Sequence, residues 1–300
     1  MVAMPGPQVA VLNTVSRLIP IGKLFVALAF LGMGVEHFVF QEFITGRAPA
    51  WPASLPGKTI WAYGSGAAMV GAGLALLVGK KGRPLVMLAG LLILLWALLR
   101  HIPIVATDTL FAGSWTRAGK ALMLFGGAFA VAATLPAENG RRKSTLLTLI
   151  NRSDEYIVLG RICLGIFLVI SGVQHFIFTR FVVTLIPAWF PGNATWWAWF
   201  AGGALLAGGI GLLVSRTAAP AALLSGLMVF SWFWIVHIPR TFVSVSDGIA
   251  VFEALAVSGI AFVVAGFLFA GRRGMELDGE TSQWARPFRV ARYARGVDPV

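Results

Sequence analysis

Eight long apolar segments are the feature that most constrains how this chain folds. They lie near residues 18–40, 60–79, 84–105, 118–135, 156–178, 196–214, 220–239 and 249–270. Each is close to the roughly 20 residues that a helix needs to cross a hydrocarbon core of about 30 Å. Backbone groups in lipid must be hydrogen-bonded within the protein, and these segments lack the short alternating pattern of barrel strands. We therefore expect transmembrane helices.

The composition supports a membrane protein and excludes several soluble classes. Hydrophobic residues make up 58% of the 300 residues and charged residues only 12%, whereas a soluble domain carries about a quarter charged residues. The net charge of +12 does not indicate a nucleic-acid partner, because the basic residues lie between apolar segments rather than on one soluble face. Cys163 is the only cysteine, which excludes an internal disulfide and a cysteine metal cluster. We expect an all-α protein embedded in a lipid bilayer.

The distribution of lysine and arginine predicts the orientation. Eight spans place both termini on one side of the membrane, together with the loops around 80–83, 136–155 and 215–219. That side carries 17 of the 24 basic residues. By the positive-inside rule, both termini are expected in the cytoplasm, with the chain crossing the bacterial inner membrane several times.

The two halves of the chain resemble each other at a period of about 138 residues, which is the signature of an internal repeat. The matching residues are Gly34, His37, Phe38, Pro49, Ala50, Trp51, Trp61, Gly64, Gly71 and Gly73 with Gly172, His175, Phe176, Pro187, Ala188, Trp189, Trp199, Gly202, Gly209 and Gly211 at an offset of 138; Pro84, Trp96, His101, Ile102 and Pro103 with Pro220, Trp232, His237, Ile238 and Pro239 at 136; and Ala121, Leu122 and Gly126 with Ala254, Leu255 and Gly259 at 133. An even number of helices per unit gives both units the same orientation. We expect eight transmembrane helices as two parallel four-helix bundle repeats.

This repeat divides the chain into five parts. They are a cytoplasmic N-terminus (1–17), a first four-helix repeat (18–138), a cytoplasmic linker (139–155), a second repeat (156–271) and a basic cytoplasmic tail (272–300). The arginines and aromatic residues of the tail suit a segment lying on an anionic leaflet, and a solvated basic tail fits the same pattern.

All four histidines are expected in one layer near the outer face. From Pro84 to His101, and from Pro220 to His237, is 17 residues, or roughly 26 Å of helix. His37 and His175 lie similarly far along the first helix of each repeat. Each half therefore supplies two imidazoles at one depth.

Ionisable residues within spans are costly and rarely face lipid, so they are the candidate site. The candidates are His37, His101, His175 and His237, with Glu36, Lys120, Arg240 and Glu253. We expect Glu36 to pair with Lys120, and Glu253 to pair with Arg240 or His175. The sequence assigns no catalytic residue, and whether the chain is an enzyme stays open.

Several ligands fit this layer. A quinone could accept a hydrogen bond from an imidazole, with its ring lined by Trp96, Trp232, Phe38 and Phe176. Haem between two imidazoles is a weaker alternative, because all the histidines share one depth. No metal site is predicted, since adjacent side chains such as Glu36 and His37 point about 100° apart on a helix. The imidazoles could also simply tie helix ends to loops.

The order and repetition of four motifs resemble the DoxX-like family of small four-helix bacterial membrane proteins. They are Gly-x-x-His-Phe at 34–38 and 172–176, the glycine-rich run 71–79, His101 and His237 at the end of the third helix, and Lys120 followed by Gly126 and Gly127. Many members carry a glutamate in the second helix, where Met69 and Ala207 stand here.

The resemblance implies a quinone-associated subunit of a redox complex, with a membrane or periplasmic partner subunit. Two other functions fit the same architecture. One is a non-enzymatic scaffold or assembly subunit of a membrane complex, and the other is a small-molecule permease with a cavity between the repeats.

Overall fold

A computed structural model describes residues 17–43, 51–52, 55–79, 82–136, 149–243 and 245–279. For residues 245–247 and 272–279 it describes the backbone only. The N-terminus before residue 17, Pro49 and Ala50, the linker up to residue 148 and the tail after residue 279 lie outside these ranges. Within them the chain is helical and has no β-strand.

The described residues form a succession of helices in each half. The first half holds α2 (Leu18–Val39), α3 (Lys58–Val78), α4 (Arg83–Trp96), the π-helical turn η1 (Ala97–His101), α5 (Ile102–Val105) and α6 (Gly113–Ala132). The second half holds α8 (Ser153–Ile177), α9 (Thr179–Val183), α10 (Ala194–Leu213), α11 (Ala218–Trp232), the π-helical turn η2 (Phe233–His237), α12 (Ile238–Arg240) and α13 (Val245–Gly279).

Among the residues that the structure describes, seven helical segments are long and apolar enough to cross a membrane. They are Leu18–Val39, Lys58–Val78, Arg83–Val105, Ser153–Ile177, Ala194–Leu213, Ala218–Arg240 and Gly248–Gly271. The remaining predicted span, 118–135, is also helical, but its helix α6 begins earlier, at Gly113. Arg117 and Lys120 lie inside α6 and lower its hydropathy, which explains why it is not one of the seven.

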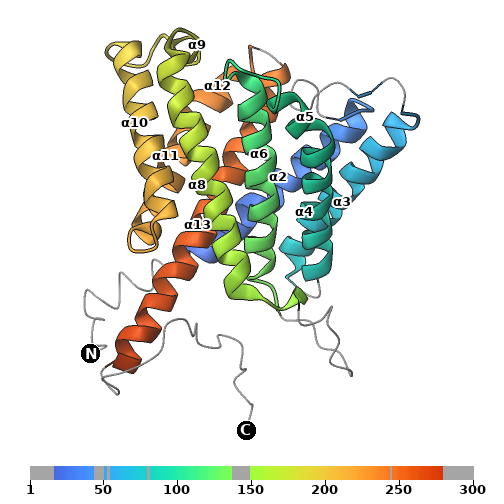
Figure 1. Ribbon diagram of the computed structural model, residues 1–300, viewed down its shortest axis with the longest axis vertical. Helices are drawn as coiled ribbons and strands as arrows, with labels where there is room; N and C mark the ends of the chain where they lie inside the picture. Colours follow the sequence, from blue (N-terminus) through green and yellow to red (C-terminus); the bar gives the residue numbers. More distant parts are fainter. Residues whose placement is uncertain are drawn as a thin grey trace, which may run out of the picture.

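The helices pack in a closed ring rather than as two independent bundles. Within each half, neighbours along the chain pack side by side, in the orders α2–α3–α4–α6 and α8–α10–α11–α13. The halves are joined by α6 against α8 and by α13 against α2 (Figure 1). The first helix of each half therefore packs along the last helix of the other half.

Glycines bring the backbones close together at both of these junctions. A Cβ added to Gly160 of α8 would lie 2.9 Å from the carbonyl oxygen of Gly126 in α6. A Cβ added to Gly259 of α13 would lie 2.7 Å from the carbonyl oxygen of Gly22 in α2. Small residues allow helices to approach closely in a membrane, where packing rather than water exclusion drives association.

Glycines also show which residues of the second helices are equivalent. A Cβ added to Gly34 would lie 2.9 Å from the Gly66 carbonyl oxygen, and one added to Gly172 would lie 2.9 Å from the Gly202 carbonyl oxygen. In the expected repeat, Gly202 thus takes the place of Gly66, at an offset of 136, and not that of Gly64, with which the sequence comparison matched it. The two-residue length difference falls in the loop before α3 and α10, not after these helices.

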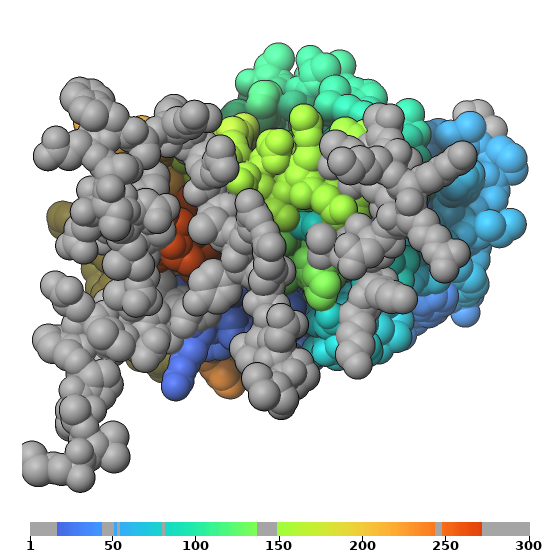
Figure 2. Space-filling model, turned by 90° about the horizontal axis from the view of Figure 1, so that it is seen from below, coloured from blue at the N-terminus to red at the C-terminus, as the bar shows by residue number. Residues whose placement is uncertain are grey.

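Buried Arg83, the first residue of α4, joins the two halves. The helices α4 and α8 begin, and α6 ends, at the lower end of the ring in Figure 1, the side from which Figure 2 views the molecule. Arg83 Nε donates to the Ala132 carbonyl oxygen at 3.0 Å, and Arg83 Nη2 donates to that of Ala133 at 3.1 Å. The other contacts of the guanidinium are Asn151 Oδ1 at 3.1 Å and Ser153 Oγ at 2.5 Å. Arg83 thereby satisfies carbonyl groups at the end of α6 and anchors them to the start of α8.

Candidate functional site

The third helix of each half widens into a π-helical turn that ends on a histidine. The turn η1 ends at His101, and η2 ends at His237. Pro103 and Pro239 follow two residues later, and a proline has no N–H to continue the α-helical ladder. Single π turns within helices are frequent at functional sites.

The larger cavity lies in the second half and has a volume of about 350 Å³. Its walls are mainly apolar and aromatic, with Phe167, Phe190, Trp197 and Trp232 among them. Its polar residues are Thr116, Lys120, Ser171, His175, Ser231, His237 and Glu253. An apolar pocket with a few polar groups is the usual form of a small-molecule site.

A smaller cavity of about 120 Å³ lies in the first half. His37 and His101 line it, together with Ser65 and Arg117. The structure therefore brings the two histidines of each half to the cavity of that half. The segments α5, α9 and α12, which follow His101, His175 and His237, all lie at the upper end of the ring in Figure 1.

An ion pair separates the two cavities. Lys120 Nζ of α6 lies 2.5 Å from Glu253 Oε2 of α13, and both residues line both cavities. The Lys120 side chain is 23% exposed and the Glu253 side chain 10%. This ion pair joins one half to the other, a contact that was not expected when each half was paired with its own acid and base.

Arg240, an expected partner of Glu253, makes a hydrogen bond to the backbone of another segment. Its Nη1 donates to the carbonyl oxygen of Thr184 at 3.1 Å. Arg240 therefore ties the segment after η2 to the end of α9, and it is not among the residues that line the larger cavity.

Two histidines have a defined hydrogen-bonding role. His37 Nδ1 lies 2.7 Å from the Met33 carbonyl oxygen, and His175 Nδ1 lies 2.7 Å from the Ser171 carbonyl oxygen. A carbonyl oxygen only accepts hydrogen bonds, so Nδ1 is the donor in both rings. In a neutral imidazole, Nε2 is then left as an acceptor.

Of the four aromatic residues predicted to line the site, the two tryptophans line a cavity and the two phenylalanines do not. Trp232 lines the larger cavity, with its ring 6.3 Å from that of His175. Trp96 lines the smaller cavity and donates to Ser65 Oγ at 2.9 Å. Phe38 and Phe176 line neither cavity and are 40% and 46% exposed. The Phe38 ring packs beside Tyr63 and Gly66 of α3, and the Phe176 ring packs beside Gly202 of α10.

Sequence reasoning missed the polar contact between Thr116 and Gln174. Thr116 Oγ1 donates to Gln174 Oε1 at 2.6 Å, and Gln174 Nε2 donates to the carbonyl oxygens of Phe111 and Ala112, both at 2.8 Å. These bonds fix the start of α6 against α8 beside the larger cavity. A glutamine near the end of an apolar span is the signal that could have identified this contact.

The described residues contain no group of three or more histidine, cysteine, aspartate or glutamate side chains that could hold a metal ion. The two cavities offer polar side chains, the Lys120–Glu253 ion pair and apolar surface. These groups suit an organic ligand that is mainly apolar and carries a few polar atoms.

Comparison with known proteins gives one family match, a domain of unknown function (DUF8561), over residues 164–257. No curated protein matches the chain, and no solved structure does. The matched segment runs from α8 into α13 and includes all the second-half residues that line the larger cavity. The chain is thus similar to this family over its second half.

Proposed function

We propose that this chain is an integral membrane protein of eight transmembrane helices, formed by duplication of a four-helix unit. In this arrangement α6 is added to the seven apolar helices and brings the number of spans to eight. The charge of its Lys120 is offset by Glu253. Three paired features support the duplication. They are the π turns before the two Ile-Pro sequences, the close glycine contacts between halves, and the backbone bonds of His37 and His175.

We further propose that the second half binds a lipophilic ring compound of the quinone or quinol class. The larger cavity is the observation that carries this proposal. Its volume of about 350 Å³ lies within the range of about 300–1,000 Å³ typical of ligand pockets. Trp197, Trp232 and Phe167 offer aromatic surface for a ring, while His175 and His237 offer polar contacts from two different helices.

The hydrogen bonds of His175 favour the reduced form of such a ligand. Because Nδ1 is bonded to the Ser171 carbonyl oxygen, the neutral ring presents Nε2 as an acceptor. An acceptor matches the hydroxyl of a quinol, whereas a quinone carbonyl needs a donor. We therefore infer that the quinol binds more tightly than the quinone.

The setting of this function remains the one that the DoxX-like motifs imply. In it, the chain is a subunit of a membrane redox complex in the bacterial inner membrane, with both termini in the cytoplasm and a membrane or periplasmic redox partner. The sequence motifs and the lysine and arginine distribution support this setting.

Binding of a quinol to the purified chain tests the proposal. The detergent-purified protein is titrated with decylubiquinol and decylubiquinone, and tryptophan fluorescence is recorded, since Trp197 and Trp232 line the cavity. Lipid extraction and an absorption spectrum identify any ligand that is already bound. We expect saturable quenching by both forms, with the quinol more effective.

A cavity-filling variant provides the specificity test. Ala201 lines the cavity, so Ala201→Trp should abolish quenching by filling the space. Ala207→Trp is the matched control, because Ala207 lies on the exposed face of the same helix. Equal binding by both variants, or no binding by the unmodified chain, would contradict the proposal. If the chain bound neither the quinol nor the quinone and instead assembled with other subunits, it would be a scaffold.

A further inference from the structure

We propose that the chain binds one ligand, not two, because the first half fills its own copy of the ligand cavity with Phe43, Trp51 and Arg100. These three residues are called the plug below. The inference rests on the proposed duplication and on the proposed ligand site in the second half. It assigns the residues that make the halves functionally different.

Arg100 is the first component of the plug. It is the fourth residue of the π turn η1, and Val236 is the fourth residue of η2. Val236 lines the larger cavity. Arg100 is buried, and its guanidinium carbon lies 4.6 Å from the ring centre of Phe43 and 5.4 Å from that of Trp51. A long cationic side chain held by cation–π contacts thus occupies the position at which the second half has a short apolar one.

Phe43 and Trp51 are the second component. Their rings stack with centres 5.5 Å apart, and both meet the edge of Trp96, at 5.0 Å and 5.6 Å. The residues at the equivalent positions, 138 residues later, are Phe181 and Trp189, which are each 64% exposed. The same pair of aromatic residues therefore covers the cavity in the first half and leaves it in the second.

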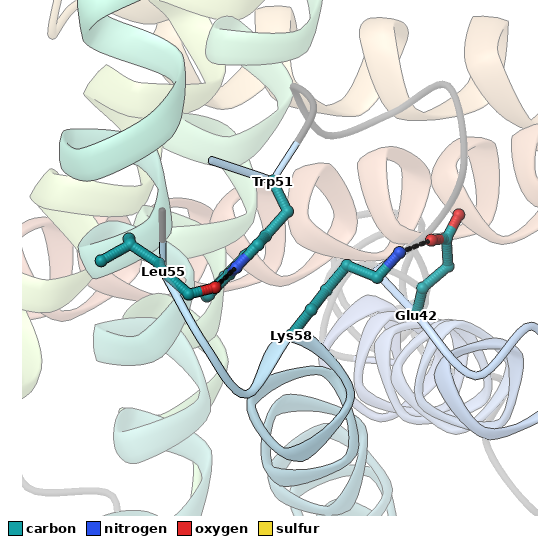
Figure 3. A network of polar contacts seen from close by, with 4 residues as sticks. All are labelled: Glu42, Trp51, Leu55 and Lys58. Carbon is teal, nitrogen blue, oxygen red and sulfur yellow. Dashed lines mark hydrogen bonds and ion pairs between the residues drawn. The ribbon is translucent and has the colours of Figure 1, made fainter. Parts of the chain in front are cut away.

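Two polar contacts in the first half hold the plug in place. Lys58 Nζ lies 2.5 Å from Glu42 Oε2, which ties the end of α2 to the start of α3 (Figure 3). Trp51 Nε1 donates to the Leu55 carbonyl oxygen at 2.7 Å in the same loop.

The second half has no residues that could make the corresponding ion pair. Arg180 stands where the first half has Glu42, and Ala194 stands where it has Lys58. The difference in cavity volume, about 120 Å³ against about 350 Å³, agrees with a filled first site and an open second site.

Cysteine labelling tests this inference without requiring a ligand. Leu92 and Met228 occupy equivalent positions, and each lines the cavity of its own half. Because thiol reactivity depends on access, we expect N-ethylmaleimide to label Met228→Cys about tenfold faster than Leu92→Cys in the detergent-purified full chain. The unmodified chain is the background control, since its single Cys163 is buried.

Removal of the plug should abolish this difference. Adding Phe43→Ala and Arg100→Val to Leu92→Cys should raise its labelling rate to within about threefold of Met228→Cys. Phe181→Ala is the matched control, because the equivalent exposed ring covers no cavity and its loss should change neither rate. The variant with Phe43→Ala and Arg100→Val is called the opened variant. If it is not monodisperse on gel filtration, Lys58→Ala with Trp51→Ala opens the loop while retaining Arg100.

Ligand stoichiometry gives the second readout. The unmodified chain should bind one decylubiquinol, and the opened variant two. Addition of Ala201→Trp to the opened variant should leave one bound decylubiquinol, in the first half. Equal labelling of the two cysteines in the unmodified chain, or unchanged labelling after both opening substitutions, would overturn the plug. Unequal labelling with no quinol bound would instead leave the plug standing and overturn the proposed ligand.

Discussion

Lys120 and Glu253 occupy equivalent positions in the two halves and pair with each other, with Nζ and Oε2 2.5 Å apart. In the proposed duplication, an unchanged copy would place two lysines or two glutamates at this contact, and like charges would repel. A base in one half and an acid in the other convert that repulsion into attraction. The divergence of these two positions therefore makes the halves complementary at the wall between the cavities.

Removal of one partner of this ion pair should be strongly destabilising. A pair this well shielded from solvent leaves an uncompensated charge when it is broken, which costs about 3–5 kcal/mol. We expect Lys120→Met and Glu253→Gln each to lower the melting temperature in detergent, and the double variant to lose less than the sum of the two. A double-mutant cycle measures this coupling.

The exposed pair Arg152–Glu155 is the matched control for that cycle. Arg152 precedes α8 and Glu155 lies in its first turn, with Nε and Oε1 3.4 Å apart. Exposed ion pairs contribute about 0.2–1 kcal/mol. If the stability losses of the Lys120 and Glu253 variants were additive, the central ion pair would contribute no more than this surface pair.

Arg83 should be needed for the junction between α6 and α8. Its guanidinium serves two carbonyl oxygens, an amide oxygen and a hydroxyl. Arg83→Met would leave these acceptors without their donor, at about 1–3 kcal/mol for each group that stays buried. Arg83→Lys should rescue stability only in part, because an ammonium cannot reproduce the planar fork. Thermal unfolding in detergent measures both.

A lysine that fully restores the melting temperature would contradict this role for the guanidinium geometry. Arg152→Met is the control for loss of a cationic side chain on the same face, since Arg152 is exposed. It should leave the melting temperature nearly unchanged.

Gly160 should not tolerate a methyl group, whereas Gly203 should. A Cβ at Gly160 would lie 2.5 Å from the Ala130 Cβ and 2.9 Å from the Gly126 carbonyl oxygen, while a Cβ at Gly203 would meet nothing within 4 Å. Overpacking of this kind costs about 1–3 kcal/mol. Gly160→Ala should therefore destabilise the protein and Gly203→Ala should not, as thermal unfolding can show. Equal effects would mean that the approach of α6 and α8 is not tight.

The helices were predictable because lipid imposes a strong local constraint. A span must contain about 20 apolar residues, and this pattern is visible without knowledge of any neighbour. The packing of α2 on α13 was not predictable in this way, since it depends on residues more than 200 positions apart. The same holds for the contact of Lys120 with Glu253, which only the closed ring brings together.

The sequence comparison matched the second helices of the two halves in the wrong register, for a different reason. Gly64 and Gly66 are two residues apart, as are Gly71 and Gly73. A two-residue shift therefore still matches glycine to glycine at two positions, Gly66 with Gly202 and Gly73 with Gly209. The contact of Gly34 with Gly66, repeated by Gly172 with Gly202, identifies the equivalent positions. Plug formation was hidden as well, because Phe43 and Phe181 are the same residue type in different surroundings.

His175 should give the site its preference for a quinol. Its Nδ1 is bonded to the Ser171 carbonyl oxygen, which leaves Nε2 as the acceptor for a ligand hydroxyl. A hydrogen bond of this kind contributes about 1 kcal/mol, or roughly a fivefold to tenfold change in affinity. His175→Leu should weaken decylubiquinol binding by that factor and change decylubiquinone binding much less. His37→Leu is the matched control, because His37 has the same backbone bond but lines the smaller cavity, so it should change neither affinity. If His175→Leu weakened both redox forms equally, the imidazole would be acting through its shape, and the preference for the quinol would need another donor–acceptor pair.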